Sequence, residues 1–135
     1  MPAISWENKY SVKIKKIDKQ HKKIISILND IYDLNQQEKP QEFVGKILQD
    51  LIEYIKYHFS TEEGYMIKYE YPDIEEQKRE HEKFIDKICE FQKEYLKHRS
   101  ITIVNLFNFI WDWFAHHILT VDKKLLPFFQ QKGVG

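Results

Sequence analysis

The chain has 135 residues, and its 21 basic residues are balanced by 21 acidic ones. This length fits one domain with a real core, and the charge balance gives no signal for nucleic acid or an anionic membrane as a partner. The single cysteine, Cys89, excludes an internal disulfide, no N-terminal stretch resembles a signal peptide, and no apolar run approaches membrane-spanning length. We therefore expect a soluble, cytoplasmic protein.

Residues 1–16 are predicted to form an N-terminal arm in front of a bundle that spans about residues 17–127. Trp6 and Tyr10 are expected to pack this arm onto the bundle, because a free tail would not need two large aromatic side chains. The lysines around residues 13–19 are interpreted as a solvated face.

The first two helices are predicted over about residues 18–34 and 40–69. Asp18 is the expected N-cap of the first helix, and Pro40 is expected in the first turn of the second. Spacings of three and four place a bundle-facing stripe on each helix. The stripes contain Ile17, His21, Ile24, Leu28 and Ile31 on the first helix, and Val44, Ile47, Leu51, Tyr54 or Ile55, His58, Glu62 and Tyr65 on the second.

The third helix is predicted from about Ile74 to His98, and the fourth begins near Ser100 and ends at Pro127. Their stripes contain Ile74, Gln77, His81, Phe84, Ile88, Phe91 and Tyr95, and then Ile103, Leu106, Ile110, Trp113 and His117. Asp122 follows His117 by five residues, which places the two about 140° apart on a regular helix. Both can face the core only if the helix bulges or breaks between them. His116 lies off the stripe and is predicted to be a surface residue.

Four amphipathic helices with short connections predict an all-α protein, an up-down-up-down four-helix bundle. Its core stripes also carry polar side chains: His21, His58, Glu62, Gln77, His81 and His117, with Asp122 as a further candidate. A lone core histidine is usually an ordinary hydrogen-bonded residue. A set spread over four helices would oppose folding unless the groups share a partner, and a metal centre is such a partner.

The donor types indicate which metals fit. Imidazoles and carboxylates without a thiolate suit iron, manganese or zinc. Two carboxylates among four histidines are many ligands for one ion, but they suffice for two ions if Glu62 and Asp122 each bridge.

The chain resembles the bacterial hemerythrins over nearly its whole length. The resemblance rests on Trp6 in the arm and on four short motifs: Asp18-Lys19-Gln20-His21, His58-Phe59-Ser60-Thr61-Glu62-Glu63, His81-Glu82-Lys83-Phe84, and His117-Ile118 with Asp122. Each motif alone is weak, whereas their combined spacing is specific.

The resemblance implies two iron ions joined by an oxo or hydroxo group, a site that binds O2 reversibly as hydroperoxide. By this analogy His21 and His58 hold the iron that is open to O2, and His81 and His117 hold the other. Glu62 and Asp122 bridge the ions, and Glu63 is expected to point outward or to support a ligand. The family's O2 pocket is matched by Ile24, Phe59, Trp113 and Ile118, whose alternative role is plain core packing.

Gln77 departs from the family pattern, which has a third histidine on the second iron at this position. An amide oxygen is a weaker ligand than an imidazole. Gln77 is therefore expected to bind iron weakly, to hydrogen-bond a bound water, or to leave a coordination position open.

The leading interpretation is an O2-binding protein that acts as a carrier, a store or the input of a sensor, rather than as an enzyme. The alternatives are a di-iron enzyme, peroxidase-like or an oxidase of iron or NO, that uses the position at Gln77, and an iron-storage bundle without O2 chemistry. The expected ligands are O2 and small anions, and because no extra apolar face is evident we expect a monomer.

Overall fold

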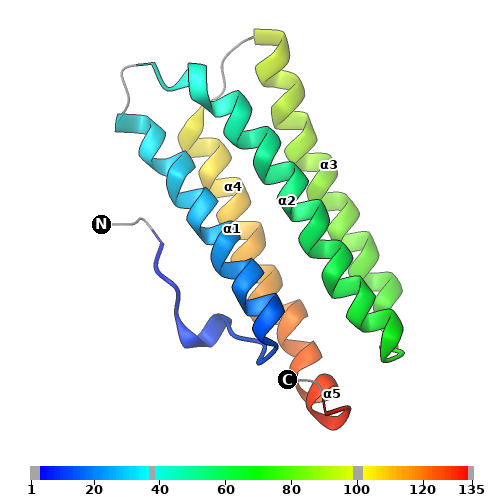
Figure 1. Cartoon of the computed structure of the whole chain (residues 1–135). Coiled ribbons are helices and arrows are strands. Elements are labelled where there is room, and N and C mark those ends of the chain that lie inside the picture. Colours follow the sequence, from blue (N-terminus) through cyan, green and yellow to red (C-terminus); the bar gives the residue numbers. More distant parts are fainter. Residues whose placement is uncertain (1–3, 37–38, 99–101, 134–135) are drawn as a thin grey trace.

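A computed structural model of the protein describes residues 4–36, 39–98 and 102–133. Four long helices, α1 to α4, lie side by side and run alternately up and down (Figure 1). The described residues contain no strand, which confirms the predicted all-α bundle. The elements are η1 (Asn8–Tyr10), α1 (Lys15–Asp33), η2 (Leu34–Gln36), α2 (Gln41–Lys68), α3 (Ile74–His98), α4 (Ile103–His116), η3 (His117–Val121), η4 (Asp122–Lys124) and α5 (Leu125–Gln131).

The N-terminal arm packs along the bundle. The Ile4 N–H donates to Asn29 Oδ1, and Asn29 Nδ2 donates back to the Ile4 carbonyl, both at 2.9 Å. The Tyr10 ring meets Trp111 of α4 edge-on at 5.8 Å and Trp6 at 5.7 Å. The expectation that Trp6 and Tyr10 pack the arm onto the body is therefore confirmed.

Asp18 is not the N-cap of α1, because the helix begins three residues earlier, at Lys15, with Ile14 in the cap position. The Asp18 carboxylate faces back along the arm, where it accepts hydrogen bonds from the Val12 N–H and the Ser11 hydroxyl. The carboxylate therefore fastens the turn that leads into α1 instead of capping its end.

Two other helix ends differ from expectation. Pro40 is the cap residue of α2 rather than a member of its first turn. Pro127 does not end the last element, because it is the third residue of α5, where a missing N–H costs no intrahelical hydrogen bond. The predicted cap Ser100 lies outside the described residues, and the described part of α4 follows Thr102 as its cap.

Gly45 makes room for a close contact between α2 and α3. A Cβ atom there would lie 2.6 Å from Cε1 of Tyr95, whose hydroxyl donates to the Gln41 carbonyl at 2.7 Å. The glycine weakens the helix by roughly 1 kcal/mol relative to alanine, and in exchange Tyr95 packs directly on the backbone.

The apolar core is divided into two clusters. The larger includes Ile24, Leu28 and Ile55, and the smaller includes Ile17, Met66 and Leu125. On α1, His21 falls between Ile17 and Ile24, and on α2, Glu62 falls between Phe59 and Met66. The buried polar residues therefore form a layer between two apolar clusters. Among the described residues, no helix is long and apolar enough to span a membrane.

Candidate metal centre

Six of the predicted ligand residues converge in this polar layer, and each is at most 1% exposed. They come from five elements: His21 from α1, His58 and Glu62 from α2, His81 from α3, His117 from η3 and Asp122 from η4. Their side chains form two groups that share Glu62.

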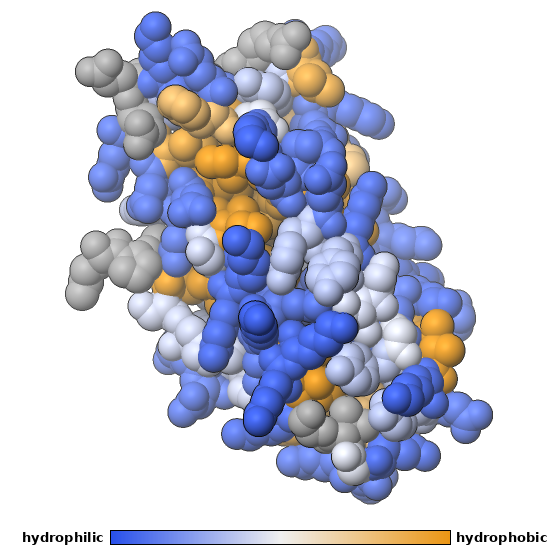
Figure 2. All heavy atoms as spheres, in the orientation of Figure 1, coloured by the Kyte–Doolittle hydropathy of each residue, from blue (hydrophilic) through white to orange (hydrophobic). Residues whose placement is uncertain are grey.

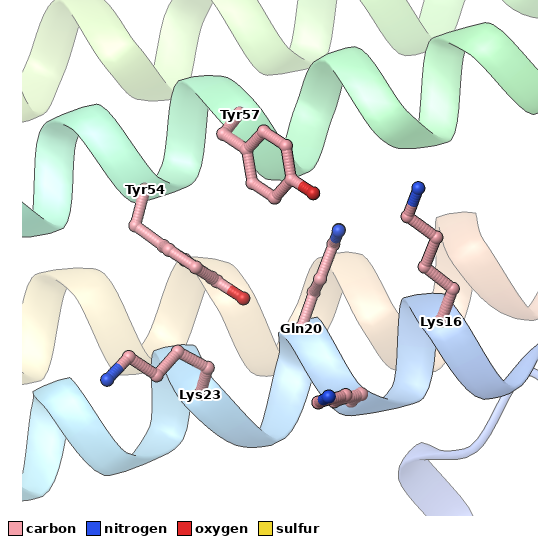
Figure 3. A pocket seen from close by; sticks show the side chains of 6 residues that line it. Lys16, Gln20, Lys23, Tyr54 and Tyr57 are labelled. Atoms are coloured by element: carbon pink, nitrogen blue, oxygen red, sulfur yellow. The ribbon is translucent and has the colours of Figure 1, made fainter.

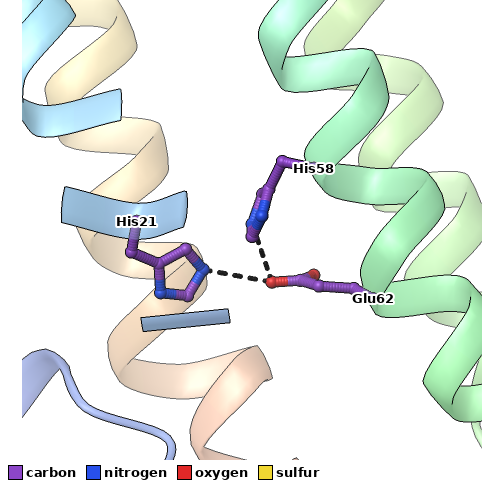
Figure 4. A group of neighbouring side chains, drawn as sticks. All are labelled: His21, His58 and Glu62. Atoms are coloured by element: carbon purple, nitrogen blue, oxygen red, sulfur yellow. Dashed lines mark hydrogen bonds and ion pairs between the residues drawn. The ribbon is translucent and has the colours of Figure 1, made fainter. Parts of the chain in front are cut away.

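The first group joins α1 and α2. Nε2 of His21 lies 3.1 Å from Glu62 Oε1, and Nε2 of His58 lies 2.9 Å from the same oxygen. Figure 4 shows both rings directed at this carboxylate. Because His58 and Glu62 are four residues apart, they lie on one face of α2, about one turn from each other.

The second group joins α3 to the segment after α4. Nε2 of His81 and Nε2 of His117 lie 3.2 Å apart. His81 Nε2 also lies 3.3 Å from Glu62 Oε2, the carboxylate oxygen that does not face the first group.

Both carboxylates span the two groups. Glu62 presents Oε1 to His21 and His58, and Oε2 to His81. Asp122 presents Oδ2 to His21 at 3.4 Å and Oδ1 to His117 at 3.0 Å. Each carboxylate therefore has one oxygen on each side, which is the arrangement required of a bridging ligand.

A π-helical turn brings Asp122 into the site. The sequence predicted that His117 and Asp122 can both face the core only if the helix bulges or breaks between them. Residues His117–Val121 form such a bulge, in which the Asp122 N–H donates to the carbonyl of His117. The wider turn compensates for the five-residue spacing, so both side chains face the bundle interior. The neighbouring His116 is exposed, as predicted.

Two histidines are oriented by hydrogen bonds on the outer side of the ring. Nδ1 of His58 lies 2.8 Å from Gln20 Oε1, and Nδ1 of His81 lies 2.7 Å from Glu63 Oε2. With the proton on Nδ1 in these contacts, Nε2 keeps a free lone pair that faces the interior of the site. Ligand histidines in metal proteins are held in this way. Glu63 thus has the supporting position expected for it.

Gln20, Phe84 and Phe114 are functional candidates to which the sequence analysis assigned no role at the site. Gln20 appeared there only as a member of the motif that ends at His21, and it is 4% exposed. The rings of Phe84 and Phe114 complete the packing around the site: Phe84 stacks on Trp113, and Phe114 meets His21 edge-on.

The charges of the site perturb the pKa values of its members. Burial lowers the pKa of His21, but the hydrogen bonds and charges of Asp122 and Glu62 outweigh burial and raise the pKa to about 9. Burial likewise lowers the pKa of His81, and Glu62 and Glu63 raise it to about 9. The pKa of His58 is lowered, chiefly by burial. Burial would raise the pKa of Glu62, but the surrounding histidines hold it well below its usual range.

The cluster has the unsatisfied donor atoms of a metal site. Six buried atoms of the ligand residues form no hydrogen bond among the described residues: His21 Nδ1, His58 Nε2, Glu62 Oε2, His117 Nδ1 and both carboxylate oxygens of Asp122. Four of these six atoms lie only at ion-pair distance from an oppositely charged or ionisable neighbour. Such groups are costly to bury unless something binds them. Imidazole nitrogens and carboxylate oxygens without a thiolate fit iron, manganese or zinc, so the residues present fit the expected pair of ions.

The four predicted pocket residues surround this layer. Ile24, Phe59 and Ile118 are buried, and Trp113 is half-buried. The Phe59 ring stacks on His81 at 3.7 Å between centroids, and the Trp113 ring stacks on His117 at 4.5 Å. These two aromatic rings therefore cover the histidines of the second group.

Gln77 is 1% exposed and lies one helical turn before His81 on the buried face of α3. The predicted register of α3 therefore places this amide in the core, as expected. Its role towards a metal stays a prediction.

The fold and the site together define a helical-bundle protein with a buried histidine–carboxylate cluster, in which two groups of side chains could each hold a metal ion. Comparison with known proteins gives the family. The model of the hemerythrin HHE cation-binding domain matches residues 12–129. Among curated proteins, the bacteriohemerythrin of Clostridium acetobutylicum is 32% identical over 125 residues, covering 90% of this chain and 97% of that protein. The bacteriohemerythrin of Methylococcus capsulatus is 34% identical, covering 82% of this chain and 83% of that protein.

The chain belongs to the hemerythrin family, whose fold carries a non-haem di-iron site that binds O2. A solved structure of a wild-type hemerythrin superposes with a TM-score of 0.86 at 29% identity, covering 93% of this chain and 96% of that one. The resemblance inferred from the sequence motifs is thus confirmed.

Proposed function

We propose that this protein binds O2 reversibly at a di-iron centre and serves as an O2 carrier, an O2 store or the input module of a sensor. The observation that carries this proposal is the position of the two carboxylates, each of which reaches a histidine in both groups. A single-ion site would need only one of the groups, whereas two bridging carboxylates hold two ions close together.

The proposed ligand sets follow from these contacts. One iron would be held by His21 and His58 with Glu62 Oε1 and Asp122 Oδ2, and the other by His81 and His117 with Glu62 Oε2 and Asp122 Oδ1. An oxo or hydroxo group is expected with the ions by analogy with the family. Two ferrous ions would supply the redox chemistry for O2 binding.

The side chains supply orientation and exclusion of water. Gln20 and Glu63 each hold a proton on the outer nitrogen of a histidine and so direct Nε2 inward. Phe59 and Trp113 cover the second group, and Ile24 and Ile118 add fully buried apolar surface. An apolar lining slows the entry of water and thereby slows oxidation to the inert ferric state.

A second candidate function is supported by Gln77, which is buried one turn before His81 where the family pattern has a histidine. The weaker amide ligand favours an open coordination position on the second iron. An enzyme that consumes peroxide, or that oxidises iron or NO, would use such a position. Turnover of peroxide well above the rate of free iron supports this candidate.

The test combines metal analysis with an anaerobic O2 titration of the diferrous protein. We expect close to two irons per chain and a reversible optical change as O2 is added and removed. His117→Gln removes a buried ligand, and His116→Gln changes the adjacent exposed histidine as a matched control. Loss of iron and of the optical change only in His117→Gln supports the proposal. Stable iron binding without any O2 response identifies a storage bundle instead.

A further inference from the structure

The charges of this chain cancel overall but are not evenly distributed. The segment 13–23 has Asp18 as its only acidic residue and contains six lysines: Lys13, Lys15, Lys16, Lys19, Lys22 and Lys23. The Asp18 carboxylate is occupied by the hydrogen bonds from Ser11 and Val12. It therefore leaves most of this positive charge uncompensated, and the first half of α1 forms a basic face.

Three of these lysines surround a hollow between α1 and α2. Lys16, Lys19 and Lys23 line a volume of about 310 Å³ together with Tyr54 and Tyr57. Figure 3 shows Lys16 and Lys23 on α1 and the two tyrosines on the neighbouring α2. Within residues 4–36, 39–98 and 102–133 none of the three lysines forms an ion pair, whereas Lys46 and Lys87 pair with a carboxylate on their own helix. Figure 2 shows this face as strongly hydrophilic side chains around a patch of intermediate hydropathy.

A hydrogen bond connects the lining of this hollow to one of the proposed metal ligands, His58. Gln20 lines the hollow and is 4% exposed. Its Oε1 contacts Nδ1 of His58 at 2.8 Å, and its Nε2 donates to Thr61 at 3.2 Å. An adjoining hollow that includes Thr61, Tyr65 and Lys68 shares Lys16 with the first. The two hollows form an extended surface over the His58 side of the centre, which we call the α1–α2 surface.

We propose that the α1–α2 surface docks an acidic electron-transfer protein that returns the oxidised centre to its ferrous state. The reduction rests on the proposed function. Two one-electron transfers would convert two ferric ions into two ferrous ions. An iron–sulfur donor with a single two-iron, two-sulfur cluster would give one electron in each of two successive encounters and would itself be oxidised by one electron each time. Gln20 and its hydrogen bond to His58 connect the docked donor to the centre, and no bond in the chain breaks.

The composition of the surface favours a protein over a small anion. All three lysine side chains are exposed, so none forms the buried charged contact that fixes a small ligand. A rim of charge around aromatic side chains is typical of protein interfaces, and Tyr57 is 53% exposed. Electron-transfer complexes are small, transient and guided by opposite charge.

The first experiment measures docking without iron. The metal-free chain is titrated with a plant-type ferredoxin, an acidic iron–sulfur protein, and NMR follows the rings of Tyr54 and Tyr57. We expect binding that weakens with salt and that falls at least tenfold in the triple variant Lys16→Glu, Lys19→Glu, Lys23→Glu. The control Lys83→Glu, Lys93→Glu, Lys97→Glu makes the same charge change on exposed positions of α3 and should keep most of the binding.

The second experiment measures reduction of the iron-loaded ferric protein. Reduced ferredoxin should reduce the α1 variant at least tenfold more slowly than the α3 variant, whereas a small photoreduced deazaflavin should reduce both equally. The proposed docking surface is wrong if the α1 and α3 variants lose ferredoxin binding or reduction rate equally. It is also wrong if ferredoxin does not shift the NMR signals of the Tyr54 and Tyr57 rings. Tighter binding to anionic vesicles or DNA than to ferredoxin also overturns it, because the partner class is then wrong. The two proposals can fail separately. If ferredoxin docks on the metal-free chain but the iron-loaded protein shows no O2 response, the proposed function is wrong and the docking surface remains supported.

Discussion

The outer nitrogens of His58 and His81 have different partners. His58 Nδ1 contacts the neutral amide of Gln20, and His81 Nδ1 contacts the carboxylate of Glu63. A carboxylate partner makes an imidazole a stronger metal donor than an amide does. If Gln77 stands in place of a family histidine, as the sequence predicts, the stronger support falls on its side of the centre, where it would offset part of the lost donor strength.

Glu63→Gln tests the contribution of this carboxylate. The amide retains a hydrogen-bond acceptor but removes the charge, so we expect metal affinity to fall about tenfold while the fold is retained. Competition with a chromophoric chelator measures the affinity. Glu82→Gln, on the exposed face of α3, is the control. An unchanged affinity in Glu63→Gln would show that the carboxylate does not support the metal through His81.

Gln77→His is expected to strengthen the second iron site. The position is buried one turn before His81, so an imidazole there would add a donor beside His81 and His117. The variant should retain iron longer under chelation and autoxidise more slowly than the wild-type protein at matched iron content. Decay of the oxygenated absorbance measures the second effect. If neither property changes, Gln77 does not act on the metals.

At the scale of elements, the π turn is the feature that joins α4 to the centre. A regular helix would rotate Asp122 away from His117, whereas η3 turns both into the bundle. The Thr120 hydroxyl donates to the carbonyl of His116, one residue before the turn, at 2.6 Å. This side chain supports the backbone where the regular helical pattern is interrupted.

Thr120→Val should therefore weaken the turn. It keeps the branched shape but removes the hydroxyl, so we expect the free energy of unfolding to fall by about 1 kcal/mol or less and metal to dissociate faster. Thr120→Ser retains the hydroxyl and should behave like the wild type. Chemical denaturation and metal-release kinetics supply the two measurements. Wild-type metal release from Thr120→Val would mean that the turn holds Asp122 without this bond.

At the scale of the whole molecule, the buried centre makes stability depend on pH in opposite ways with and without metal. In the metal-free protein, His21 and His81 have pKa values raised to about 9 from 6.5 in the unfolded chain. Folding then favours the protonated histidines, a contribution that is complete below pH 6.5 and is lost as pH rises to about 9. The lowered pKa of Glu62 adds a contribution that is lost on acidification below about 4.5.

The lowered pKa of His58 acts in the opposite sense, because it makes folding less favourable as pH falls below about 6.5. We therefore expect the metal-free protein to be most stable at about pH 6.5 and to lose stability towards pH 9. The metal-loaded protein should instead become more stable as pH rises above about 5, because metal binding needs neutral imidazoles and displaces their protons. Thermal unfolding of both forms at pH 5.5, 7 and 8.5 measures the trend. Melting temperatures that stay equal at pH 8.5 would contradict the idea that metal holds these side chains.

The sequence by itself determined the helices, their buried faces and the candidate ligands, because apolar spacing and chemically costly buried groups are local signals. It also set the condition for Asp122 to join the site, a bulge or break after His117, which η3 meets. Only the tertiary structure decided which atoms meet across elements: that each carboxylate spans both groups, that Gln20 and Glu63 support different histidines, and that Asp18 fastens the arm. The lysines of α1 likewise looked like an ordinary solvated face until α2 placed two tyrosines opposite them. These contacts depend on the rotation and separation of neighbouring helices, which many side chains set together and no single stretch of sequence encodes.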